Sequence, residues 1–473
     1  MFANIRLHMK GYNFLFILII GFAFAVGIAG STGCAQIGAP TGGPRDSIPP
    51  RLVNSTPPIN SVSFSGNRIS LTFNEYIEVR DVQNNVLVSP YQKTTPVVEF
   101  KLKTVTIKLK DSLLPNTTYA IDFGNAIVDN NEGNPLKNFT YVFSTGKQID
   151  SLELDGRLIM AESGGNDSTL IVLLYKNAVD SSVQKNKPDY IARVNGKGNF
   201  NFSYLPAGRY WVYALKDGDG SKTYNSKVET FAFADGPVMV SVNTKPVTLY
   251  AYAESKGNKT VPKLNVKPNP ADKKLKYTAS VFGQSQDLKT PLTLEFNKVL
   301  KIFDKTKMVL TDTNYKAIPG VTMTLDSTRK KISYSMAWQP ETKYLLVINS
   351  AAVSDSADLV LAKSDTLHII TKREADYGKL VLRFSNIDLA KHPVVQFVQG
   401  DEVKESFPIT AMEWKNDRFN PGDYELRILF DSNQNGKWDP GNYSRKQQPE
   451  VVIQLTQKLN IRADWENERE IKL

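Results

Sequence analysis

Short runs in which apolar and polar residues strictly alternate are the feature that most limits how this chain can fold. Such runs occur at Ile69–Phe73, Val98–Leu102 and Val105–Leu109. Because the pattern repeats every two residues, every second side chain lies on the same face of a strand. This indicates antiparallel sheets with one solvated face. Turn-forming clusters such as Asp129–Pro135 separate the runs, and no convincing amphipathic helical pattern follows the N-terminal segment. The sequence therefore predicts an all-β chain.

The side-chain inventory narrows the chemistry that this chain can perform. Its 473 residues include 1 Cys and 3 His, and 22% of them are charged. One cysteine excludes a disulfide scaffold, and so few Cys and His exclude a Cys/His zinc module and most histidine-based catalysis. The β-domains must then be held together by core burial alone, which is feasible for units of about 100 residues.

The N-terminus reads as an export signal. Arg6 and Lys10 precede the uncharged apolar run Phe14–Gly30, which is at the lower edge of the roughly 17–25 residues needed to span a bilayer. Ser31, Thr32 and Gly33 follow, and then Cys34, the sole cysteine. This arrangement resembles a bacterial lipobox, with Ser31 at the position usually held by Leu. Met9 is an alternative start to Met1.

The lipobox resemblance implies cleavage before Cys34 and attachment of acyl chains to that residue. Residues 1–33 would be the signal peptide, and two or more chains would give stable membrane anchoring. The alternative is an uncleaved N-terminal helix in which Cys34 is incidental. Residues 34–47, rich in Gly and Pro, would be a tether.

The tether has further features in common with known proteins. Its Pro-Thr-Gly-Gly-Pro-Arg-Asp sequence at 40–46, followed by Pro49 and Pro50, resembles the start of a group of Bacteroidetes lipoproteins with bacterial Ig-like domains. The resemblance implies an outer-membrane lipoprotein of the cell envelope. No acidic cluster, as used for surface export, follows Cys34, so the periplasmic and the surface-facing orientation both stay open. Exported chains do not meet nucleic acid, which excludes that partner despite the net charge of +10.

An internal repeat divides the chain into two similar halves. Ile69–Asn74 resembles Leu292–Asn297, and Leu114–Tyr119 resembles Gln339–Tyr344. Further along, Leu205–Tyr210 resembles Asn420–Tyr424. We therefore predict an A unit and a B unit, followed by a second A unit and a second B unit.

The A units, residues 48–147 and 277–374, resemble the bacterial Ig-like domain of S-layer and other envelope proteins. In the first A unit the resemblance rests on Leu71–Glu75, Pro115–Tyr119, Ile127–Asp129 and Phe143–Gly146. The second A unit is degraded, because Val353–Ser356 lacks the Gly-Asn-Pro-Leu that follows Asp129 in the first.

The B units, residues 148–254 and 375–473, resemble prealbumin-like or carboxypeptidase-regulatory-like β-sandwiches. Gly198–Phe202 leading into Leu205–Tyr210 carries this resemblance. Residues 255–276 between the halves are rich in Lys and Pro and are predicted to be a solvated linker. The fold class expected is tandem antiparallel β-sandwiches behind a lipoprotein signal.

One loop fits a calcium site. Asp431, Asn433 and Asn435 stand at alternate positions, Gly436 allows a sharp turn, and Asp439 follows. Calcium prefers several oxygen ligands, and alternate residues of such a loop turn their oxygens inward. A calcium-binding EF-hand, however, has a Glu at the twelfth position, where this chain has Asn442. The alternative is a turn built from Asx side chains that bond their own backbone. The loops at Asp217–Ser221 and Asp129–Glu132 are weaker candidates.

Neither a nucleophile elbow nor a phosphate loop occurs in the chain, so we expect it not to be an enzyme and to require no cofactor, calcium aside. Its expected role is a spacer, scaffold or binding and adhesion module, anchored by lipid and contacting an envelope protein or glycan. The alternative is a glycan-binding or glycan-processing accessory lipoprotein, since 48 acids leave a carboxylate pair open. Exposed aromatic residues would favour it, and Trp438, inside a polar turn, is expected to be the most exposed tryptophan.

Overall fold

The computed structural model describes residues 19–23, 45–176, 179, 181–255, 274–281, 283, 285–400 and 402–473. Nearly all of its regular structure is β-strand. Apart from a helical stretch at 19–23, the α-helices in these ranges are two single turns, α2 (Val82–Asn85) and α3 (Ser182–Lys185). The predicted all-β class of tandem antiparallel sandwiches is confirmed. No helix within the described ranges is long and apolar enough to cross a membrane.

The first A unit is a sandwich of short strands. One sheet has the order β1-β2-β6-β5 and the other β4-β7-β9, and β3 pairs with β8. The alternation predicted for Ile69–Phe73 is real, because Ile69, Leu71 and Phe73 are buried in the core. The strands are β1 (Leu52–Thr56), β2 (Arg68–Phe73), β3 (Ile77–Val79), β4 (Leu87–Ser89), β5 (Val97–Lys101), β6 (Thr104–Lys108), β7 (Thr118–Asp122), β8 (Ile127–Asp129) and β9 (Thr140–Ser144).

The second A unit repeats this topology. Its sheets have the orders β18-β20-β24-β23 and β19-β27-β25-β22, with β21 paired to β26. Even the parallel pairing of β19 with β27 has a counterpart, the parallel bridge from Ser61 to Phe143 in the first A unit. The strands are β18 (Tyr277–Ala279), β19 (Ser285–Gln286), β20 (Leu292–Phe296), β21 (Leu300–Phe303), β22 (Met308–Thr311), β23 (Thr322–Leu325), β24 (Lys331–Ser335), β25 (Lys343–Ile348), β26 (Val353–Asp355) and β27 (Asp365–Thr371).

The B units also share one topology. The first has sheets β13-β10-β17 and β12-β11-β14-β15, with β16 also on β14, and the second has β31-β28-β34 and β30-β29-β32-β33. The first unit's strands are β10 (Leu152–Met160), β11 (Ile171–Lys176), β12 (Tyr190–Arg193), β13 (Asn199–Leu205), β14 (Gly208–Leu215), β15 (Phe231–Phe233), β16 (Val238–Val240) and β17 (Val247–Ala251). The second unit's are β28 (Gly378–Ser385), β29 (Pro393–Gln399), β30 (Glu402–Pro408), β31 (Glu413–Phe419), β32 (Gly422–Phe430), β33 (Val452–Ile461) and β34 (Glu466–Lys472).

One pairing in each B unit departs from the expected antiparallel pattern. The last strand lies parallel to the first, β17 beside β10 and β34 beside β28. Strands that are joined by a tight hairpin must run antiparallel. The last strand of each B unit instead reaches the first one by a connection across the sandwich, so it can run parallel to it.

Four separate clusters of buried apolar residues correspond to four consecutive parts of the chain. They are centred on Phe143, Tyr210, Tyr334 and Phe397, each fully buried in its own unit. Leu52 is the first of the described residues that packs against any of them. All four of these cores therefore lie in the described chain from Arg45 onward.

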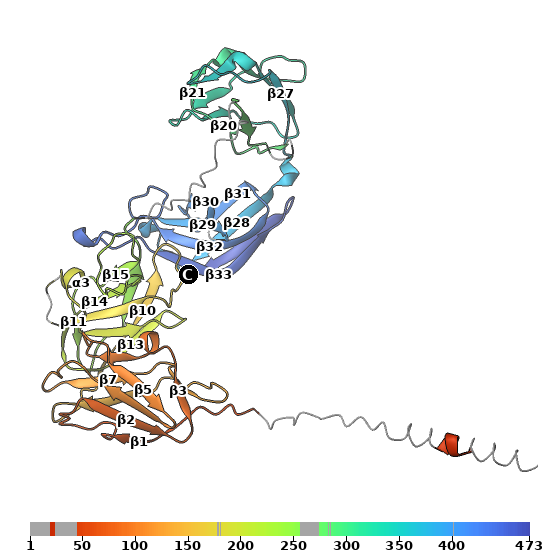
Figure 1. Cartoon of the computed structure of the whole chain (residues 1–473). Helices are drawn as coiled ribbons and strands as arrows, with labels where there is room; N and C mark the ends of the chain where they lie inside the picture. The colour runs from red at the N-terminus through yellow and green to blue at the C-terminus, as the bar shows by residue number, and fades with distance from the viewer. Residues whose placement is uncertain are drawn as a thin grey trace, which may run out of the picture.

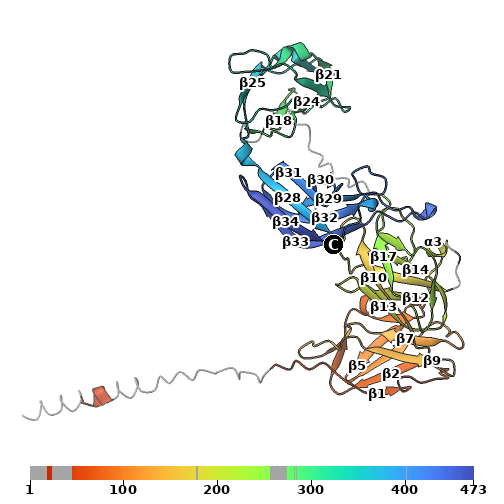
Figure 2. The ribbon, with the colours of Figure 1, turned by 180° about the vertical axis from the view of Figure 1, so that it is seen from behind.

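The spatial order of the units differs from their order in the sequence. Figures 1 and 2 show the first A unit, the first B unit, the second B unit and the second A unit in succession, so that the two A units lie at opposite ends. The C-terminal B unit thus packs directly against the first B unit, and the second A unit is held beyond it.

Candidate functional site

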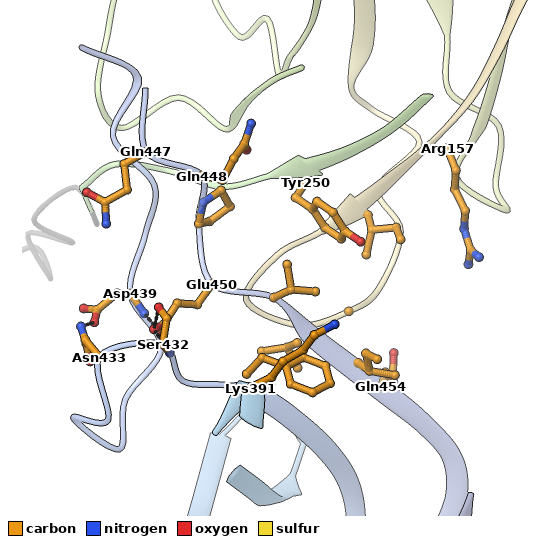
Figure 3. Close-up of a pocket in the computed structure, with 17 residues that line it drawn as sticks. Arg157, Tyr250, Lys391, Ser432, Asn433, Asp439, Gln447, Gln448, Glu450 and Gln454 are labelled. Atoms are coloured by element: carbon orange, nitrogen blue, oxygen red, sulfur yellow. Dashed lines mark hydrogen bonds between the residues drawn. The ribbon is translucent and has the colours of Figure 1, made fainter. Parts of the chain in front are cut away.

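A long loop forms the junction between the two B units. It is built by residues 431–451, which connect β32 to β33 and which we call the joint loop. The loop reaches from the second B unit to β15 of the first. It also passes near β17, which carries Tyr250 (Figure 3). It also contains all four residues predicted as calcium ligands.

Those four residues lie together and bond to one another. The buried carboxylate of Asp431 accepts backbone N–H groups from Asn435 at 3.2 Å and Gly436 at 2.7 Å. The side-chain amides of Asn433 and Asn435 both donate to Oδ2 of Asp439, at 2.5 and 2.7 Å. These are the bonds of a turn closed by Asx side chains.

A residue that the sequence analysis missed completes this turn. Glu450 is buried, and its Oε1 accepts from the backbone N–H and hydroxyl of Ser432, both at 2.8 Å. Its Oε2 accepts the backbone N–H of Asp439 at 3.1 Å. Glu450 thus holds both ends of the turn, while Asn442 at the twelfth position lies elsewhere in the loop. Nothing in the sequence signals this role, because it depends on how a long loop folds back on itself.

Calcium binding at Asp431, Asn433, Asn435 and Asp439 stays a prediction. Among the residues that the structure describes, no group of three or more His, Cys, Asp or Glu side chains could hold a metal ion. In the corresponding loop of the first B unit, the Lys222 ammonium pairs with the Asp217 carboxylate, so a cation of the chain itself already neutralises that acid.

The second half of the joint loop inserts one side chain into the first B unit. Tyr443 begins a single 3-10 turn, η6 (Tyr443–Arg445), and is 4% exposed. Its ring centroid lies 5.1 Å from Phe231 and 5.4 Å from Phe233, both on β15. Tyr213 and Tyr224 are each 6.0 Å away. An aromatic group enclosed edge-to-face by four others is typical of a protein core rather than of a loose contact between domains.

Polar contacts fix the orientation of this insertion. The backbone N–H of Tyr443 donates to Oε1 of Glu254 at 3.0 Å, and the Tyr224 hydroxyl donates to the same oxygen at 3.1 Å. Burial raises the pKa of the Tyr224 phenol, and the Glu254 carboxylate raises it further. The Gln448 side chain donates to the Phe233 carbonyl at 3.0 Å and to Asp235 at 2.7 Å.

Two glycines allow the units to approach this closely. A Cβ on Gly164, which has φ of +73°, would lie 2.6 Å from the backbone nitrogen of Gln454 in the second B unit. A Cβ on Gly441 would lie 2.6 Å from the Tyr252 ring of the first. Beside them, the Val452 N–H donates to the Ala161 carbonyl at 3.0 Å. The two B units therefore come close enough for their backbones, as well as their side chains, to be in contact.

A cleft of about 830 Å³ remains where the two B units meet. Arg157 and Tyr250 of the first unit and Lys391 and Gln454 of the second line it, and Figure 3 shows them around the joint loop. Its acids, Asp439 and Glu450, are engaged in the bonds of the turn. The arrangement is thus a joint between domains, with a cleft left beside it.

The remaining site predictions fall elsewhere. Cys34 lies outside the described residues. Asp129 is buried and forms a structural turn, because its carboxylate accepts the backbone N–H groups of residues 131–134 at 2.6–3.1 Å. Burial opposes that charge, but the four N–H groups keep the pKa of Asp129 below its usual value.

The expectation that Trp438 is the most exposed tryptophan is wrong, since its indole packs into the joint and donates to the Glu450 carbonyl at 2.7 Å. Trp465 is the exposed tryptophan.

Comparison with known proteins defines the class of one part of the chain. Residues 46–145 match the family model of the bacterial Ig-like domain, so the first A unit is a domain of that class. No curated protein matched the chain.

Solved structures similar to this chain are distant. They include α-2-macroglobulin of Escherichia coli, at 14% identity and TM-score 0.19 over 39% of this chain and 72% of that one. The Bacillus anthracis TIE protein has 10% identity and TM-score 0.17 over 91% and 75% of the two chains. The major pilin subunit BcpA of Bacillus cereus has 11% identity and TM-score 0.15 over 69% and 99%. At these TM-scores none of them bears on function.

Proposed function

We propose that this chain is a non-catalytic scaffold of the bacterial cell envelope, tethered by lipid at Cys34, that holds two Ig-like domains a fixed distance apart. The joint carries the proposal. Tyr443 makes the two B units one body, and the A units extend from its two ends (Figure 1). A chain that only needed flexible spacing would not bury an aromatic side chain between domains, because relative motion is the default for domains in tandem.

Several observations support the envelope setting. The first A unit belongs to a domain class described as bacterial and Ig-like, and the tandem repeat is evident in both the sequence and the sheets. The apolar run Phe14–Gly30 and the single Cys34 behind it resemble a lipoprotein signal. We assign the protein to the outer membrane of a Bacteroidetes species on that resemblance, with its partner an envelope protein or glycan.

The alternative function, binding or processing of glycan, has less support. It would be favoured by a concave patch of exposed tryptophan and tyrosine. Of the five tryptophans, all of them among the described residues, Trp338 is buried, three are half-buried and only Trp465 is exposed. Scattered aromatics favour the scaffold.

Protease digestion of intact cells tests both the anchor and its orientation. Cells carrying wild type or Cys34→Ala are divided into two portions: one is fractionated, and the other is treated with proteinase K before and after the outer membrane is permeabilised. We expect wild type to sediment with membranes and Cys34→Ala to appear in the soluble fraction. Identical fractionation would refute the lipid anchor. Degradation in intact cells would show a surface-facing scaffold, and protection until permeabilisation a periplasmic one.

A further inference from the structure

The hairpin between β5 and β6 carries apolar side chains where a soluble domain usually places polar ones. Leu102 and Lys103 form its two-residue turn, the hairpin tip. Leu102 is 64% exposed, and nearby Tyr76 and Phe100 are 54% and 46% exposed. Together they border a shallow groove of about 980 Å³. Three large apolar side chains exposed at one place mark an interaction surface rather than the scattered exposure that is normal.

Leucine is an unusual residue for the backbone conformation at the hairpin tip. Leu102 has φ of +55°, in the left-handed region, where Gly, Asn and Asp are the residues usually found. A leucine there costs about 1–2 kcal/mol in backbone strain. Because its side chain packs into no core of the described residues, the fold gains nothing in return. The cost indicates a contact outside the domain.

The tip is held rigidly beside the point where the chain enters the domain. The Ile77 N–H donates to the Leu102 carbonyl at 3.0 Å, and the Lys103 ammonium donates to the Asn74 carbonyl at 2.7 Å. The Asn74 side chain in turn accepts the backbone N–H of Arg51 at 2.6 Å. Arg51 follows the tether, and Figure 1 shows the described chain arriving beside β3 at this end of the unit.

The charges around the tip complement an anionic surface. Arg68, Lys101 and Lys103 border the groove with a single acid, Glu99. The Lys103 ammonium also lies 5.5 Å from the centre of the Tyr76 ring. Basic residues beside exposed aromatic and aliphatic side chains are typical of surfaces that lie at a membrane interface.

We propose that the tip patch, formed by Tyr76, Phe100 and Leu102 with Arg68, Lys101 and Lys103, docks the first A unit onto the anionic lipid surface to which the chain is tethered. The proposed anchor places that membrane within reach, because residues 35–44 span at most about 36 Å when extended. Docking would set the orientation of the scaffold relative to the membrane, a property that a flexible tether alone cannot provide. The rigid joint would transmit that orientation to the second A unit.

The test uses residues 35–473, which contain the four cores described above but neither the apolar run nor Cys34. Co-sedimentation is measured with vesicles of phosphatidylcholine alone and of equal parts phosphatidylcholine and phosphatidylglycerol. We expect binding to the anionic vesicles that falls in 1 M NaCl, where the screening length is about 3 Å. Leu102→Asn is expected to weaken it roughly tenfold, since one leucine is withdrawn from the lipid. Lys101→Glu is expected to weaken it about fivefold or more.

Matched controls separate docking from folding. Leu114→Asn alters a leucine that is 57% exposed in the same unit, beyond the opposite end of β6, and should bind as wild type does. Asparagine tolerates the left-handed region, so Leu102→Asn should keep or raise the melting temperature. The proposal is overturned if residues 35–473 do not bind anionic vesicles, or if Leu102→Asn and Leu114→Asn bind equally well. None of these outcomes depends on Cys34, so failure of the anchor and failure of docking are distinguishable.

Discussion

Replacing Tyr443 by alanine should open the joint while leaving both B units folded. The ring is 4% exposed, and truncation of a large buried aromatic side chain costs about 3–5 kcal/mol. This loss reduces the free energy with which the two B units dock rather than the stability of either unit. Tyr443 belongs to the cluster shared with the first B unit and not to the core of its own unit. The ratio of docked to undocked molecules should therefore fall by about two to four orders of magnitude. The bonds that remain, such as the pair from Gln448, contribute about 1 kcal/mol each.

Spin labels attached to introduced cysteines report this change directly. Cys34 is the sole native cysteine, so a Cys34→Ser background has none that would compete for the label. Labels at Lys197 in the first B unit and Asp417 in the second would give one narrow distance distribution in wild type and a broad one in Tyr443→Ala. Tyr443→Phe keeps the ring and should stay narrow. Tyr315→Ala, which truncates an exposed tyrosine of the second A unit, should also stay narrow. A distribution in Tyr443→Ala as narrow as that of wild type would refute the assignment of docking energy to this ring.

Three further predictions concern the joint and the turns. Gly164→Val should broaden the same distance distribution, because its Cβ would meet the Gln454 backbone at 2.6 Å. Asp129→Asn should lower the free energy of unfolding by about 1–3 kcal/mol near pH 7. The folded pKa of Asp129 is lowered, so its stabilisation is present above the unfolded-state pKa and is lost as pH falls through the folded value. In urea denaturation, the difference in free energy of unfolding between wild type and Asp129→Asn should thus become smaller in acid. A difference that is constant with pH would contradict this account. Calorimetry with calcium distinguishes the two interpretations of the joint loop: heat for one ion per chain that is lost in Asp439→Ala would establish a calcium site, and no heat in wild type would leave the loop as a hydrogen-bonded turn.

The repeating elements of this fold were predictable because they depend on short-range patterns. The alternation at Ile69–Phe73 fixes which side chains face the core, and all three apolar ones are buried. The similarity of Ile69–Asn74 to Leu292–Asn297 predicted that the same sheet would recur, and β2 and β20 hold equivalent places in it. The turn at Asp129–Pro135 was predicted for the same local reason.

The joint was not predictable, because it depends on contacts between residues far apart in the chain. Trp438 stands among polar residues, and its sequence neighbours indicated exposure, whereas its indole packs against apolar residues of both B units. Gly164 likewise acquires its role only once the second B unit has docked, and the role of Glu450 depends on how the joint loop folds back on itself. The sequence indicates the four units only in their order along the chain, and no local pattern reveals that the second B unit lies next to the first.

The composition of the joint follows from the internal repeat. The loop after β14 in the first B unit and the joint loop after β32 in the second occupy equivalent positions, and each contributes a tyrosine to one aromatic cluster. Tyr224 stacks on Phe231 at 4.0 Å, and Tyr443 meets the same ring edge-on at 5.1 Å. Glu254 binds both tyrosines, one through its hydroxyl and the other through its backbone N–H. Because the second A unit is inserted between the two B units in the sequence, their association places that unit at the far end of the molecule.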